Sequence, residues 1–477
     1  MADPVLDAHR VLPGLFVIST PVRPISIRDQ MVRARLLVDR LVQHGALEPV
    51  PARPLLVVGA GAGGVTAAIR AAERGWPTWL VDEAPMAFGL QAASTTRWLD
   101  PAQYDWPAEH WQQGYYPWDL PPMPLTYPAA WSRDLALHWS LELAAARRRL
   151  PLLRVDFNLR VQRIVPPAST GALHVQLGSA YVGWPFPLQP VAGIVWAAGF
   201  GTEQCRIIRG GAPVYEGRRF WSSDPLALPG CGLSPIGSTP TVPTVLIAGA
   251  GDGGLQDWLR AITKLRSARA IYELLQPSRG IERRLQTAEE QAHRSLLWQH
   301  PQDRRYQHAV QAALQDAHLA AVDIAITERP VLAGLSRLFR QPPDDVRLVY
   351  RCTHFTNQYG LNRFLVLLIA RYLKAEYGRD LLLPERGLVD VRSLDGHVCL
   401  AGPPGHCDGR DHEVELETYP RCFAGAIGPA GTIRAGLIVV RYGLDTRAAT
   451  VPLPPARQHL SRLSRPDHSL PYHVPRS

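Results

Sequence analysis

One segment near the N-terminus constrains the fold of this chain more than any other. The hydrophobic run Leu55 to Val58 enters Gly59-Ala60-Gly61-Ala62-Gly63-Gly64, which is a G-x-G-x-x-G turn. A helical stretch from Val65 to Arg74 follows, and Thr78 to Val81 predict a second strand that leads directly into Asp82. This order of strand, tight turn, helix, strand and acid is typical of Rossmann units that bind dinucleotides.

Each residue type in this turn has a physical role in holding a dinucleotide. Gly59 permits the tight turn, Gly61 lets the backbone approach a pyrophosphate, and Gly64 lets the helix pack closely on the strand. The helix N-terminus offers N–H groups and a partial positive charge to the phosphates. Asp82 is spaced to accept a hydrogen bond from a ribose hydroxyl. The cofactor-binding residues that we expect in this unit are Gly59, Gly61, Gly63, Gly64, Asp82 and Glu83.

The segments after this unit favour FAD over NAD as its ligand. A helix is expected over 132–150, and alternating apolar positions between residues 153 and 200 predict a run of strands. The last of these strands leads into Ala197-Ala198-Gly199. This order resembles the FAD-binding fold of the glutathione-reductase and hydroxylase type, in which a strand with a similar ending passes behind the dinucleotide domain. The resemblance implies that Ala198 and Gly199 also contact the cofactor.

A second glycine turn, Gly249-Ala250-Gly251-Asp252-Gly253-Gly254, follows the apolar run Val245 to Ala248. One interpretation makes it an NAD(P)H site. Tyr272 then stands where the first unit has Asp82, and Asp252 puts a negative charge inside a phosphate-binding turn. The other interpretation makes it the motif that closes the flavin site in the same class of flavoproteins, with Asp252 accepting a bond from the ribityl chain. We favour the flavin interpretation, which adds three residues to the expected cofactor contacts: Gly251, Asp252 and Gly253.

Residues 96–107, 249–257 and 359–364 together resemble a group of bacterial FAD/NAD(P)-binding oxidoreductase-like proteins. The resemblance implies an α/β fold, with a Rossmann-like three-layer ββα domain that binds FAD/NAD(P) and an additional, largely helical domain. It supplies no substrate. The signatures of amine oxidases and of Baeyer–Villiger monooxygenases are absent from the sequence.

The pattern of the sequence predicts the domain organisation. We expect an N-terminal arm and helix over 1–49, and an FAD-binding domain over 50–260 that includes an aromatic loop at 98–131. A mostly helical cap or substrate domain with terminal strands is expected over 261–450, and a flexible tail over 451–477.

Charge and hydropathy argue against a nucleic-acid partner and against a membrane span. The net charge of +9 is spread along the chain without a basic and aromatic patch, so no nucleic-acid partner is expected. No apolar run reaches the roughly 18 residues of a membrane span, and no leader is recognisable, so we expect a cytoplasmic protein. A small-molecule substrate is expected, and a homo-oligomer is left open.

Several other side chains are candidates for the site. Arg97 could contact the pyrophosphate or simply pack in its loop. A group of aromatic residues could line a pocket or form a packed loop: Trp98, Tyr104, Trp106, Trp111, Tyr115, Tyr116 and Trp118. A group of polar residues could reach the flavin or form a buried network: Asp257, Tyr359, Asn362 and Arg363.

A final group of histidine and cysteine side chains consists of residue types that bind metals. It consists of His397, Cys399, His406, Cys407 and His412. Their spacing differs from that of standard zinc modules, so we interpret them as scattered loop residues and expect no metal.

These features predict an FAD-dependent oxidoreductase that transfers a hydride or electrons between the flavin and a small molecule. An NAD(P)H-dependent flavin monooxygenase is one alternative, with NAD(P)H as a second cofactor. A protein that senses dinucleotides or binds a partner without turnover is another. No catalytic acid, base or nucleophile can be assigned from the sequence.

Overall fold

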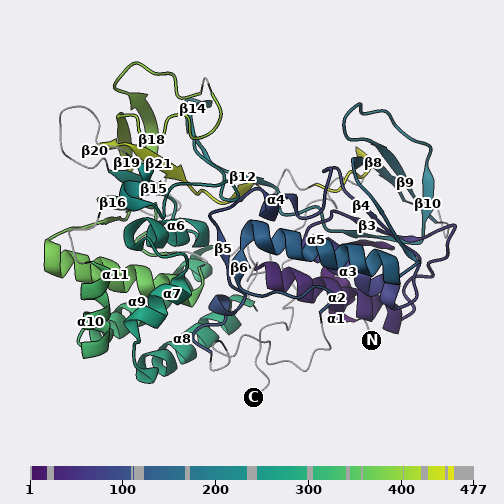
Figure 1. Ribbon diagram of the computed structural model, residues 1–477, viewed down its shortest axis with the longest axis horizontal. Coiled ribbons are helices and arrows are strands. Elements are labelled where there is room, and N and C mark those ends of the chain that lie inside the picture. The colour runs from purple at the N-terminus through teal and green to yellow at the C-terminus, as the bar shows by residue number, and fades with distance from the viewer. Residues whose placement is uncertain are drawn as a thin grey trace.

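The computed structural model describes residues 3–18, 26–108, 111, 123–166, 172–233, 244–297, 304–339, 344–355, 358–400, 402–420, 428–445 and 450–455. Over these residues the chain forms two lobes that lie side by side (Figure 1). Each lobe is built on a mainly parallel sheet, with helices on one face and a three-stranded antiparallel sheet on the other.

The first lobe contains a six-stranded sheet in which only the edge strand β1 runs antiparallel to its neighbour. The order of the strands is β1 (Arg10–Leu12), β2 (Leu15–Val17), β11 (Gly193–Trp196), β3 (Leu55–Val58), β4 (Thr78–Val81) and β7 (Leu153–Asp156). Side chains alternate between the two faces of a strand. Leu55 and Val57 therefore pack against the helices, while Leu56 and Val58 pack against the antiparallel sheet.

The helices and the antiparallel sheet complete this lobe. The helices are α1 (Pro4–His9), α2 (Ile27–Gln43), α3 (Ala62–Glu73), α4 (Gly89–Ala92) and α5 (Ser132–Arg149). The antiparallel strands are β8 (Leu159–Val165), β9 (Leu173–Ser179) and β10 (Gln189–Val191). A capping box between Ser26 and Asp29 fixes the start of α2, which packs on α3. The predicted three-layer ββα fold is confirmed.

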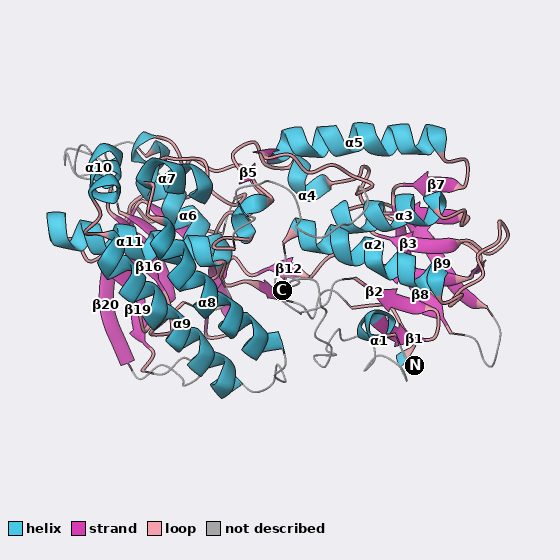
Figure 2. Ribbon diagram, turned by 90° about the horizontal axis from the view of Figure 1, so that it is seen from below, coloured by secondary structure: helices cyan, strands magenta, loops and turns pink. Residues whose placement is uncertain are grey.

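The second lobe repeats this plan and adds several helices (Figures 1 and 2). Its parallel sheet has the order β17 (Leu382–Leu383), β16 (Val346–Val349), β15 (Val245–Ala248) and β21 (Leu437–Val440). Its antiparallel strands are β18 (Arg386–Ser393), β19 (His412–Thr418) and β20 (Gly428–Ala435). Its helices are α6 (Asp252–Thr263), α7 (Ala268–Leu275), α8 (Arg279–Leu297), α9 (Arg304–Ala325), α10 (Arg329–Leu338) and α11 (Gly360–Tyr377).

The second lobe begins earlier in the chain than the sequence suggested. Strand β15 and most of helix α6 fall within the expected first domain, 50–260, but β15 belongs to the second sheet and α6 packs on it. The expected helical domain, 261–450, contains the predicted helices together with the remaining strands of that sheet.

Short strands and turns connect the lobes. They are β5 (Trp98–Leu99), which pairs with β6 (Ala130–Trp131), β12 (Thr202–Glu203), which pairs with β22 (Leu444–Asp445), and the hairpin of β13 (Arg206–Arg209) and β14 (Ala212–Glu216). The β12–β22 pair links residues just after β11 to residues just after β21. The predicted tail lies outside the described residues from residue 456 onward. No helix in the described part of the chain has the length and apolar character needed to cross a membrane.

Candidate functional site

The first glycine turn has the close contacts that its glycines were expected to permit. Gly59 has a φ of +102°, and a Cβ atom there would lie 2.5 Å from the carbonyl oxygen of Ala197 at the end of β11. A Cβ on Gly64 would lie 1.8 Å from the carbonyl oxygen of Gly59. Both positions therefore require glycine for the fold itself.

Gly61 is different, because the space in front of it is open. It is the N-cap of α3 with an ordinary φ of −75°, and no atom lies within 4 Å of the place a Cβ would take. No side chain caps the helix, and N–H groups in a helix's first turn have no partner within the helix. A pyrophosphate fits this cradle, because it needs both a close backbone approach and free donors. Gly63 instead faces α2, with Gln30 nearby.

Asp82 lies at the carboxyl end of β4, beside the turn. Its carboxylate accepts hydrogen bonds from the backbone N–H of Ala60 and, at 2.7 Å, of Ala84. Burial raises the pKa of Asp82, and these two hydrogen bonds partly offset the rise. The neighbouring Glu83 is exposed and pairs with Arg160 at 2.8 Å. Asp82 is thus fixed beside the turn, as a ribose acceptor must be.

The end of β11 also approaches this turn. The N–H of Ala197 donates to the carbonyl of Val58 at 2.7 Å, which continues the sheet up to the glycine turn. Ala198 follows, and Gly199 has a φ of +87° that turns the chain away. Ala198 and Gly199 therefore lie next to the first glycine turn, and their contact with the cofactor stays a prediction.

The glycines of the second turn have the same φ regions and the same close backbone contacts as those of the first. Gly249 has a φ of +112°, and its Cβ would lie 2.1 Å from the carbonyl oxygen of Arg441, at the end of β21. A Cβ on Gly254 would lie 1.9 Å from the oxygen of Gly249, and Gly251 caps α6 and faces open space. The strand order β21-β15-β16-β17 likewise matches β11-β3-β4-β7. The second turn therefore belongs to a separate parallel sheet that repeats the plan of the first, and β15 is not part of the first sheet.

Asp252 is the main difference between the two turns, because Ala62 stands at its place in the first. The Asp252 carboxylate accepts a hydrogen bond from Nδ2 of Asn362 at 2.6 Å and from Nε2 of Gln256 at 2.7 Å. Asn362 comes from α11, which lies over the turn. The neighbouring Arg363 is fully buried and donates to Gln358 at 3.3 Å. These polar residues of α11 form a network inside the second lobe.

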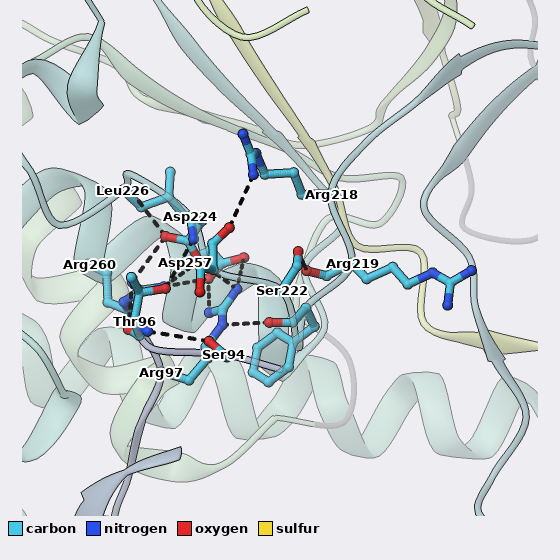
Figure 3. Close-up of polar contacts among 12 residues, drawn as sticks. Ser94, Thr96, Arg97, Arg218, Arg219, Ser222, Asp224, Leu226, Asp257 and Arg260 are labelled. Atoms are coloured by element: carbon cyan, nitrogen blue, oxygen red, sulfur yellow. Dashed lines mark hydrogen bonds and ion pairs between the residues drawn. The ribbon is translucent and has the colours of Figure 1, made fainter. Parts of the chain in front are cut away.

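Arg97 joins the two lobes (Figure 3). Its guanidinium is 2% exposed and donates both terminal nitrogens to Asp257 of α6, and it also pairs with Asp224 at 3.2 Å. Its Nε donates to the carbonyl of Phe220 at 2.7 Å. Arg441 donates to the same Asp257 at 2.8 Å. Every guanidinium nitrogen of Arg97 thus has a protein partner.

The electrostatics of this cluster follow from its burial. Burial alone would raise the pKa of Asp257, which is fully buried, but the guanidinium groups of Arg97 and Arg441 hold that pKa far below its usual range. Arg260 contacts both Asp224, at 3.0 Å, and Asp257, at 3.4 Å. We call the cluster of Arg97, Asp224, Asp257, Arg260 and Arg441 the interlobe clamp.

Tyr104, Trp106 and Trp111 of the 98–131 loop pack against the second lobe, whereas Tyr127 packs on Trp139 of α5 in the first lobe. Trp106 is 3% exposed and stacks on Phe364 at 5.3 Å, and Trp111 donates to Glu282 at 3.1 Å. Tyr104 lies against Tyr359, with 4.3 Å between ring centroids. Tyr115, Tyr116 and Trp118 lie outside the described residues. The loop is thus a packing element between the lobes over its described part.

Residues 55–114 match the family model described as FAD binding domain. The match begins at β3 and covers the first glycine turn, Asp82 and Arg97. It confirms the prediction of a Rossmann-like FAD-binding domain with FAD as cofactor, and it supports the class predicted from the sequence, the FAD-dependent oxidoreductases. No curated protein matches the chain.

Several solved structures resemble the chain at low identity. The thioredoxin reductase of T. acidophilum is 10% identical with a TM-score of 0.37, and the match covers 83% of this chain and 81% of that chain. The bacillithiol disulfide reductase of Bacillus cereus is 10% identical with a TM-score of 0.41, over 83% and 80%. A flavin monooxygenase variant from Stenotrophomonas maltophilia is 17% identical with a TM-score of 0.30, over 44% and 55%. With scores below 0.5, these likenesses carry no functional argument.

Proposed function

We propose that the chain is an FAD-dependent oxidoreductase that binds FAD at the first glycine turn and takes electrons from NAD(P)H bound at the second. The observation that carries the FAD assignment is the open cradle at Gly61, with Asp82 fixed beside it, inside the segment that matches an FAD binding domain. The substrate is a small molecule whose chemistry the described residues do not define.

The repeat supports NAD(P)H as the second ligand. Two turns with the same contacts, each at the start of a parallel sheet, offer two cradles for two dinucleotides. This arrangement favours a reductase or a monooxygenase over an oxidase, because both of the former need a site for a reduced pyridine nucleotide. Asp252 weakens the second cradle for phosphate, since a carboxylate at a helix N-terminus competes with an anion.

The chain's own residues would position and shield the reacting groups. FAD supplies the hydride and electron chemistry when it is bound. The amides of the Gly61 turn and the N-terminus of α3 would balance pyrophosphate charge, and Asp82 would accept a ribose hydroxyl. The interlobe clamp and the packed loop with Trp106 would fix one dinucleotide unit against the other. We therefore assign Arg97 to positioning the lobes, because its nitrogens are already bonded to Asp257, Asp224 and Phe220.

An anaerobic titration tests this proposal. The purified chain is loaded with FAD, and NADH or NADPH is added without oxygen while the flavin absorbance is followed. The proposal predicts bleaching, and it predicts that Gly251→Val slows bleaching while FAD stays bound. Bound flavin that neither nucleotide reduces would refute the NAD(P)H part. Bleaching that Gly251→Val leaves unchanged would place the nucleotide elsewhere.

A further inference from the structure

The loop between β18 and β19 brings cysteine and histidine side chains together. The ligand atoms of Cys399, Cys407 and His412 all lie within 4.8 Å of one another. Those of His397, His406 and Cys407 do so as well, so Cys407 belongs to both groups. The sequence spacing gave no indication of this, because the loop folds back on itself and His412 begins β19.

The group of Cys399, Cys407 and His412 is buried, and Sγ of Cys407 contacts the carbonyl oxygen of Cys399 at 3.5 Å. The exposed fractions are 8%, 3% and 1%, and both thiols are free. Neither ring nitrogen of His412 has a hydrogen bond of good geometry in the structure. The carbonyl groups of Arg410 and Ala435 lie near the ring, but neither makes a hydrogen bond of good geometry with it, so the imidazole is available to a ligand.

His406 is oriented as a metal-binding histidine would be. Its Nδ1 lies 2.9 Å from the carbonyl oxygen of Pro403, whereas its Nε2 lies 3.4 Å from that of Val398. The shorter contact assigns the proton to Nδ1, which leaves Nε2 with its lone pair, 3.5 Å from Sγ of Cys407. Metal-bound histidines commonly donate their other nitrogen to a backbone carbonyl in this way.

We propose that Cys399, Cys407 and His412 bind a Zn²⁺ ion, and that His406, which shares only Cys407 with this group, turns toward the ion as the fourth ligand. Two thiolates and two imidazoles form a closed tetrahedral set of the kind found at structural zinc sites. Binding would release the two thiol protons to solvent, so zinc affinity rises with pH. The set leaves no open position for a substrate, so the role of the ion is structural.

The site is connected to the interlobe clamp. Asp408, next to Cys407, pairs with Nε of Arg218 at 2.7 Å. The carbonyl of Arg218 accepts a hydrogen bond from Arg441 at 2.6 Å, and Arg441 binds Asp257. A zinc ion in this loop would thus hold Arg218, which Figure 3 shows beside the clamp, in the position that supports it.

The test is the metal content of the full chain, purified without an affinity tag from zinc-supplemented cells. The proposal predicts roughly one zinc ion per chain. Cys407→Ser, which removes the thiol common to both groups, should lower the content by about tenfold or more. Cys231→Ser is the matched control, because Cys231 is also a free, buried cysteine but lies in the other core of the second lobe. It should keep the zinc.

Additional measurements cover the case in which Cys407→Ser does not fold. Co²⁺ added to zinc-free wild-type chain should give thiolate-to-cobalt charge-transfer absorption, which His406→Asn should weaken and Cys231→Ser should preserve. The proposal is overturned if the folded wild-type chain takes up neither metal, or if zinc persists in folded Cys407→Ser. It is also overturned if peptide mapping finds a Cys399–Cys407 disulfide in the freshly purified, metal-free chain. None of these results depends on flavin, so this inference can fail while the proposed function stands.

Discussion

Valine at position 61 should abolish FAD binding and leave the fold intact. The structure has no atom within 4 Å of a Cβ at this position, and the φ of −75° suits any residue. Valine is a poorer N-cap than glycine, which costs about 1 kcal/mol at most. Its two methyl groups would, however, fill the space that the pyrophosphate needs.

The size of the effect follows from linkage. At an FAD concentration 100 times Kd, binding stabilises a protein by about 2.7 kcal/mol. For a lobe of this size, each kcal/mol shifts Tm by roughly 2–4 °C, so FAD should raise the Tm of the wild type by about 5–11 °C. Gly61→Val should lose this rise while its Tm without FAD falls by only a few degrees.

The assay is thermal unfolding with and without FAD, followed by tryptophan fluorescence. Gly251→Val is the matched control, since Gly251 caps α6 with the same open space and a φ of −77°. It should keep the full FAD-dependent rise. The reasoning is refuted if FAD stabilises Gly61→Val as much as the wild type, or if Gly251→Val alone loses the effect.

Three further predictions concern the clamp, the second turn and a buried histidine. Asp257→Asn should destabilise the chain by about 3 kcal/mol in denaturant unfolding, because it leaves buried guanidinium groups without a charged partner. Asp380 forms an ion pair with Lys374 in which both side chains are exposed, by 62% and 59%. Asp380→Asn should therefore lower the free energy of unfolding by less than about 1 kcal/mol. Asp252→Ala should leave FAD affinity unchanged and tighten NADPH binding several-fold by removing a charge from the phosphate turn; loss of FAD from the folded variant would instead favour the flavin-closing interpretation. Burial lowers the pKa of His9 to about 4, and the unfolded chain, with a histidine pKa of about 6.5, binds more protons between these values. Stability should therefore fall by about 3 kcal/mol as pH drops from 6.5 to 4, and His9→Gln should flatten that dependence in pH-dependent unfolding.

The first unit could be predicted from sequence because its signals are local. The strand, turn, helix and acid of residues 55–82 are contiguous, and Gly59 and Gly64 make contacts that only glycine allows. The helix predicted at 132–150 is α5 (Ser132–Arg149), and the alternating segments became β8 and β9. Such periodicity predicts these elements correctly because each of them buries one face.

The second sheet was missed because its strands are far apart in sequence. Helices α6 to α10 separate β15 from β16, so the position where a second strand and acid were sought, Tyr272, falls inside α7. Strand β20 contains Gly428 and Gly431, which are poor strand formers, and it exists through pairing with β19. Residues 397–400, which fall within the part of the chain where terminal strands were expected, form a loop.

The candidate site was predicted only in part, because contacts between residues far apart in the sequence leave no local pattern. The roles of Gly61 and Asp82 can be inferred from neighbours in the sequence. The pairing of Arg97 with Asp257 joins residues from different lobes, and no local pattern encodes it. The cluster of Cys399, Cys407 and His412 likewise depends on how one loop closes.

The most direct test of the central claim is the absorption spectrum of the purified wild-type chain after FAD is added and free FAD is removed. The account predicts oxidised-flavin bands, at roughly one FAD per chain, that Gly61→Val lacks. A wild-type chain that folds yet stays colourless after loading would contradict the claim that the first glycine turn binds FAD.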